Sequence, residues 1–256
     1  MGAAQAKLSE QREIIDLLRV LEQSKLMKER QEVESLVNYL DSMESQFGEV
    51  LKELKEVKGQ LTQIQDKGVK SSATRLMEGA ENKIGEIGSQ LQTVRENIVK
   101  SAKQAVQIFK EKGVGALQKA VEAMKIPSAL SRLKEAFHSG KESMNDRAEQ
   151  MATIGSEIHE AKSHAKNAGR ILMGKAAKEA EPQNTDKGIT AKIQKAYLAC
   201  GRGFELMEQG TDRAMKKLEK FMERGKKPSV KEELKKLKSE KATSPKLPVP
   251  QKEQGR

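Results

Sequence analysis

The feature that most constrains the fold of this chain is an unbroken seven-residue repeat between residues 33 and 64. Apolar side chains alternate three and four positions apart, along one line from Val33 to Leu61 and a second from Leu36 to Ile64. Such a repeat holds one stripe of a helix against a neighbouring helix over its whole length, about 50 Å at about 1.5 Å per residue. The sequence therefore predicts a long coiled-coil helix.

A second repeat follows in a new phase, from Met77 to Ile108. The intervening residues 65–75 have no apolar repeat and read as a helix–helix turn. The simplest expectation is a hairpin of two antiparallel helices. The predicted coiled-coil seam comprises Val33, Leu36, Leu40, Met43, Phe47, Val50, Leu54, Val57, Leu61, Ile64, Ile84, Ile87, Leu91, Val94 and Ile98.

Shorter signals divide the rest of the chain. Apolar residues before position 27 are out of phase with the first repeat, which indicates either a separate N-terminal helix or a stutter. Gly113 and Gly115 interrupt the second helical pattern, Pro127 ends or kinks the chain, and Ser128 is a plausible N-cap for the next helix. The expected regions are an N-terminal helical region 8–66, a second coil with a short amphipathic helix 73–126, a third long helix 128–175, a linker 176–188, a C-terminal helix 189–223 and a tail 224–256.

Composition agrees with an all-α fold. The chain is 36% hydrophobic, 3% aromatic and 33% charged, which suits helices that each bury one stripe. No segment shows the period-two pattern of a strand. We expect long amphipathic helices that form hairpins or an elongated bundle, with a disordered, proline-containing basic tail.

Other features point to a cytoplasmic protein. The single cysteine excludes an intramolecular disulfide, no apolar run reaches the roughly 18–20 residues of a membrane span, and the N-terminus lacks the apolar core of a signal peptide. Ala6 stands where a myristoylation signal requires Ser or Thr. These patterns predict a soluble protein in a reducing compartment.

The stretch HEAKSH, residues 159–164, comes within one residue of the zinc motif HExxH. His159 and His164 are five positions apart, so on a helix they are separated by about 140° and share one metal ion poorly. Cys200 lies on an apolar line beside Tyr197 and Phe204, which favours burial over nucleophilic chemistry. We therefore expect no catalytic, cofactor-binding or metal-binding residues.

Basic segments suggest two alternative partners. Residues 224–256 hold eleven Lys or Arg and four Glu, so the tail supplies +7 of the net charge of +11. It could bind nucleic acid through phosphate contacts from Lys226, Lys227, Lys231, Lys235, Lys236 and Lys238. Helix 98–126 places lysines beside an apolar strip and could bind an anionic membrane surface.

Three stretches, VNYLDSMESQ at 37–46, FKEKGVGALQKAVEAMKI at 109–126 and EIHEAKSHAKNAGRILMGK at 157–175, resemble an uncharacterised family of helical proteins from gut Firmicutes. Genes of that family often lie beside conjugative-element genes. The resemblance spans residues 10–175 and leaves out the tail. It implies a bacterial cytoplasmic protein that is encoded on a mobile element, and it implies no known activity.

The leading hypothesis is a non-enzymatic helical protein that acts by assembly, as a scaffold or in protein–protein interaction. Each seam needs a partner helix, from the same chain, from a second copy in a homo-oligomer, or from another helical protein. The repeat cannot choose among these, but Leu or Phe at a with Val or Ile at d argues against a parallel dimer. No small-molecule substrate is expected.

Overall fold

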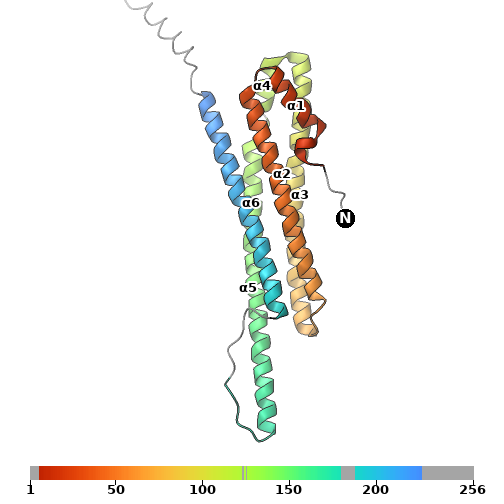
Figure 1. The fold of residues 1–256 in the computed structure, drawn as a ribbon, viewed down its shortest axis with the longest axis vertical. Coiled ribbons are helices and arrows are strands. Elements are labelled where there is room, and N and C mark those ends of the chain that lie inside the picture. The colour runs from red at the N-terminus through yellow and green to blue at the C-terminus, as the bar shows by residue number, and fades with distance from the viewer. Residues whose placement is uncertain (1–5, 123, 125, 180–187, 227–256) are drawn as a thin grey trace, which may run out of the picture. The chain divides into compact units, whose positions relative to one another are not determined.

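The computed structural model describes residues 6–122, 124, 126–179 and 188–226, and every regular element within them is helical. The predicted all-α fold is therefore confirmed, as a bundle of long helices (Figure 1). The chain divides into two units, residues 1–216 and 217–256, and the packing below is that of the first. In chain order the elements are the 3-10 helix η1 (Leu8–Glu10), α1 (Arg12–Gln23), α2 (Met27–Leu61), α3 (Lys67–Lys112), α4 (Val114–Glu122), α5 (Ile126–Leu172) and α6 (Ile189–Lys226).

Helices α2 and α3 form an antiparallel hairpin. Lys58 Nζ lies 2.7 Å from Glu81 Oε1, and Arg95 Nη1 lies 2.5 Å from Glu44 Oε2. Lys58 and Glu44 are two heptads apart on α2, whereas Glu81 and Arg95 are two heptads apart on α3 in the opposite direction. The two helices therefore keep one register along this stretch.

The two apolar repeats are buried inside this unit. Every position of the predicted seam is buried except Phe47, which is half-buried with its ring against Gly88. Helix α3 packs against α1, α2, α4 and α5, and α2 packs against η1, α1 and α3. The helices opposite the seams thus belong to the same chain, which the repeat alone left open.

Residues 8–66 are divided into η1, α1 and α2 rather than forming one region of continuous helix. The break falls at Lys25, whose φ of 58° ends α1, and the Leu26 N–H donates back to the Leu21 carbonyl at 2.9 Å. This geometry is a left-handed C-cap, which reverses the chain. Of the two expectations for this region, the separate N-terminal helix is therefore the one that the structure has.

Polar contacts fasten η1 onto the hairpin. The Asp41 carboxylate accepts the backbone N–H groups of Leu8 at 2.6 Å and Ser9 at 3.1 Å. The Arg95 guanidinium donates to the Ala6 carbonyl. These contacts satisfy backbone groups that a buried helix end would otherwise leave unpaired, because Leu8 is fully buried.

The turn between α2 and α3 is shorter than the predicted turn at 65–75. Helix α3 begins at Lys67, because the Asp66 side chain caps it by accepting the Val69 N–H at 2.9 Å. Gly68 and Ser71 lie within the first turns of the helix.

Helix α5 also begins earlier than predicted. It starts at Ile126, so Pro127 occupies its first turn, where a missing N–H costs nothing. Ser128 lies inside the helix and is not its N-cap. Upstream, Gly113 ends α3 with a φ of 76°, as the predicted interruption requires, whereas Gly115 lies within α4.

Glycines let α6 approach its neighbours closely. A Cβ atom on Gly203 would lie 2.5 Å from Val50 Cγ2 on α2, and one on Gly201 would lie 2.7 Å from Asn145 Oδ1 on α5. The sequence predicts that these glycines weaken the helix, by about 1 kcal/mol each relative to Ala. In the structure they are points at which the helix lies close against α2 and α5.

A half-buried tyrosine adds a polar contact between α2 and α6. The Tyr39 hydroxyl lies 2.6 Å from Thr211 Oγ1 and donates to the Met207 carbonyl at 3.1 Å. Burial raises the pKa of Tyr39 to about 12, so the hydroxyl stays protonated and able to donate.

Two glycine substitutions test this packing. Gly203→Ala should lower the free energy of unfolding by about 1–3 kcal/mol, because the stiff Val50 side chain has little room to move. Gly85→Ala is the control, since nothing lies within 4 Å of its new Cβ. It should raise stability by up to about 1 kcal/mol. Urea unfolding followed by circular dichroism measures both, and a Gly203→Ala variant as stable as the wild type would contradict the close approach.

Candidate functional site

Helix α5 extends past the apolar core. Along its seven-residue line, Leu130, Phe137, Met144 and Met151 are fully buried, whereas Ile158 is half-buried and Ala165 is exposed. Figure 1 shows the last turns of α5 running on beyond the turn between α2 and α3. The predicted third long helix therefore lacks a described partner helix over its C-terminal third.

The charged side chains of α5 change character along the helix. In its buried half, Lys134 pairs with Asp212 at 2.7 Å and Lys141 pairs with Glu208 at 3.0 Å, both acids lying on α6. His138 also contacts Glu208, and these hydrogen bonds hold the pKa of Glu208 below its usual value despite desolvation, which alone would raise it. These two lysines are therefore paired with acids on α6, whereas Arg147 donates to the backbone carbonyls of Leu76 and Ser143.

The far end of α5 has no such match. Residues 162–178, here named the basic end, hold five Lys or Arg and no Asp or Glu. Within the described part of the chain, none of Lys162, Lys166, Arg170, Lys175 and Lys178 takes part in an ion pair. The basic end is therefore a concentrated positive surface.

The chain after α5 folds back along the helix and adds to this surface. Gly174, with a φ of 71°, closes the helix, and the Lys175 N–H donates to the Arg170 carbonyl at 2.9 Å. The Asn167 side-chain amide then makes two hydrogen bonds to the backbone of Lys178, donating to its carbonyl at 2.8 Å and accepting its N–H at 3.0 Å. Arg170 Nε donates to the Ala176 carbonyl at 2.9 Å.

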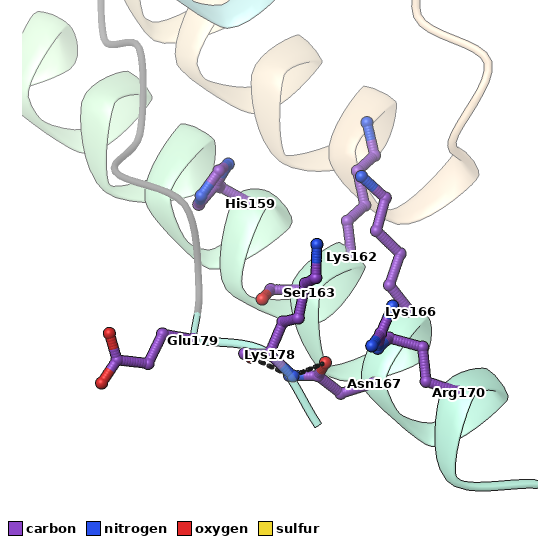
Figure 2. A pocket seen from close by; sticks show the side chains of 8 residues that line it. All are labelled: His159, Lys162, Ser163, Lys166, Asn167, Arg170, Lys178 and Glu179. Carbon is purple, nitrogen blue, oxygen red and sulfur yellow. Dashed lines mark hydrogen bonds between the residues drawn. The ribbon is translucent and has the colours of Figure 1, made fainter. Parts of the chain in front are cut away.

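This fold-back creates a shallow cavity of about 240 Å³ (Figure 2). In Figure 2 the Lys162 and Lys166 side chains project to the same side of α5, and the Glu179 carboxylate lies on the opposite side of the view. The lining residues are His159, Lys162, Ser163, Lys166, Asn167, Arg170, Lys178 and Glu179. Ammonium, guanidinium, hydroxyl and amide donors gathered in this way suit an anion with several oxygen acceptors.

Apolar side chains are exposed beside these cations. Ile171 is 61% exposed, Leu172 is 87% exposed and Met173 is 68% exposed. We name these three residues the apolar tip. Three consecutive exposed apolar side chains make this end of the helix a candidate for contact with another surface.

The two histidines of HEAKSH lie in different surroundings. His159 is half-buried and lines the cavity, whereas His164 is exposed and does not line it. Among the residues that the structure describes, no group of three or more His, Cys, Asp or Glu side chains is placed to hold a metal ion.

The other predicted sites fall in different places. Lys227, Lys231, Lys235, Lys236 and Lys238 of the tail lie outside the described residues, as does the side chain of Lys226. The predicted helix 98–126 is divided between α3 and α4, and its apolar residues Ile98, Ala102, Ala105, Leu117 and Val121 are buried in the core. A membrane surface would meet mainly the polar sides of these two helices.

The single cysteine lies in the core. Cys200 is fully buried, and its Sγ donates to the Val50 carbonyl at 3.7 Å. Burial raises the pKa of the thiol to about 12, so a thiolate is not available near neutral pH.

The sequence holds a signal for the basic end that is separate from the heptad pattern. The absence of acids from 162 to 178 is visible in the printed sequence. That run becomes informative only when the structure leaves this part of α5 without a described partner, because most charge runs are solvated helix faces.

The model of the Family of unknown function (DUF6674) matches residues 10–255. This match extends past residue 175, where the resemblance seen in the sequence ends, and so includes the tail. No curated protein and no solved structure shows a significant match.

Substitution of Asn167 tests the fold-back. Asn167→Ala removes both hydrogen bonds to Lys178, so the Lys178 amide should exchange with solvent faster, by roughly 5-fold for the loss of about 1 kcal/mol. Hydrogen exchange read by mass spectrometry measures this, with Asn97→Ala, an exposed helical position, as the control. Equal exchange at Lys178 in the wild type and Asn167→Ala would contradict the hydrogen bonds between Asn167 and Lys178.

Proposed function

The chain belongs to the Family of unknown function (DUF6674), and we propose that it is a non-enzymatic interaction protein that binds an anionic partner on the basic end of α5. One observation carries this proposal: the long seams are buried within the chain, while the cations of the basic end have no described acidic partner. Burial of the seams supports a self-contained scaffold over a homo-oligomer built through them.

The state of the reactive side chains supports a non-enzymatic role. The Cys200 thiol is buried and its raised pKa disfavours the nucleophilic thiolate. His138 contacts Glu142 on its own helix at 3.1 Å and Glu208 on α6 at 2.9 Å, so its ring is engaged in packing contacts at the surface.

The setting of this function is part of the same proposal. The sequence resemblance supports a bacterial cytoplasmic protein, with an accessory role for a mobile element. None of the helices within the described residues has both the length and the apolar character needed to cross a membrane.

The tail supplies a second candidate function. Its net charge of +7 and its inclusion in the family match support contact with nucleic acid through phosphate groups. Such binding would be independent of the basic end, so variants of α5 would leave it unchanged.

Binding to heparin, a sulfated polyanion, tests the leading proposal. The triple variant Lys162→Gln, Lys166→Gln, Lys178→Gln should lower the slope of log affinity against log salt by roughly 2–3, since each lost anion contact removes about 0.9 or less. The matched control neutralises three exposed lysines of helix 98–126: Lys103→Gln, Lys110→Gln, Lys119→Gln. If both triple variants change the slope equally, or neither does, the basic end is not the docking surface.

A further inference from the structure

We propose that the basic end of α5 binds the surface of an anionic phospholipid bilayer, with the apolar tip entering the interface and the cations contacting lipid phosphates. This inference rests on the proposed function and names the partner. It transfers the membrane contact from helix 98–126, whose apolar strip is buried, to a segment whose apolar side chains are exposed.

The geometry of the apolar tip favours a fluid surface. Ile171 and Leu172 are the last residues of α5 and Met173 follows directly. Neighbouring residues on a helix point about 100° apart, so these side chains fan out around the helix end. A groove on a folded protein accepts one face of a helix, whereas the interfacial layer of a bilayer can surround side chains that point in several directions.

The charges complement the same partner. Five cations within residues 162–178 lie beside the apolar tip with no acid among them, and each cation near an anionic leaflet raises affinity roughly 5-fold. Lys166 and Lys162 lie about one and two helical turns before Arg170, so a bilayer that takes up the tip meets them next. Even a single myristoyl chain binds membranes only weakly, and a second signal such as a cluster of cations gives stable attachment.

Other partners match only part of this surface. Nucleic acid pairs with the cations but offers no layer for three aliphatic side chains. A second copy of this chain carries the same +5 stretch and a net charge of +11, so two such surfaces repel one another. Free phosphate could occupy the cavity but leaves the apolar tip in water.

The test is sedimentation of the full chain with vesicles of phosphatidylcholine, with or without about 30 mol % phosphatidylglycerol. The wild type should bind only the anionic vesicles. The triple variant Lys162→Gln, Lys166→Gln, Lys178→Gln should lose on the order of 100-fold in partition coefficient, since it removes three charges. The control Lys103→Gln, Lys110→Gln, Lys119→Gln should change binding by less than about 3-fold.

A second variant isolates the apolar contribution. Leu172→Ser with Met173→Ser should lose roughly 10-fold or more in vesicle binding, because buried apolar area is lost while charge is kept. Its binding to heparin should match the wild type. Both residues are exposed, so the bundle should fold normally, which helical circular dichroism checks.

Each other outcome overturns the proposal. Equal vesicle binding by the wild type and both α5 variants would assign the membrane contact to another segment, such as the tail. If the wild type binds no vesicles while the lysine variant still lowers the salt dependence of heparin binding, the docking surface stands and the bilayer is excluded. Tight binding of duplex DNA by the Leu172→Ser, Met173→Ser variant would then favour nucleic acid. Release from vesicles by inorganic phosphate at constant ionic strength would indicate a single-anion site. If the lysine variant changes neither vesicle binding nor heparin binding, the proposed function is overturned as well.

Discussion

The antiparallel apolar seam between α2 and α3 is the interaction on which the rest of the bundle depends. Its aliphatic side chains are worth roughly 1.5–3 kcal/mol each when fully buried. The ion pair of the buried Arg95 with Glu44 fixes its register, because removing one member of such a pair costs about 3–5 kcal/mol. Helix α3 in turn packs against α1, α4 and α5, so a shift in the register between α2 and α3 would displace all three.

The limits of this seam explain where a functional surface arises. Glycines on α6 bring it against α2 and α5, and the acids Glu208 and Asp212 pair with lysines of α5. Beyond Met151 the line of large, fully buried side chains on α5 ends, yet the helix continues to Leu172. The same rod therefore serves first as core and then as an exposed basic surface.

Much of the architecture is predictable from the sequence, because a strict heptad repeat identifies both the helix and its buried stripe. The helix that packs against each stripe is not predictable, since a heptad repeat identifies the buried face of one helix and not its partner. The turn at 65–75 is predicted too long because Gly68 and Ser71 are tolerated once Asp66 caps the helix. The basic end is missed because Ala165 and Leu172 continue the apolar line of α5, and only the structure leaves them exposed.

The central claim is that the seams pair within one chain. Lys58 Nζ and Glu81 Oε1 lie 2.7 Å apart, so a carbodiimide can join them without a spacer. Chains labelled with ¹⁴N and ¹⁵N would be mixed, unfolded, refolded together and cross-linked, and the joined peptides weighed by mass spectrometry. Pairing within the chain predicts that both halves of the Lys58–Glu81 peptide carry the same label. Hybrid peptides with one half of each label would contradict it.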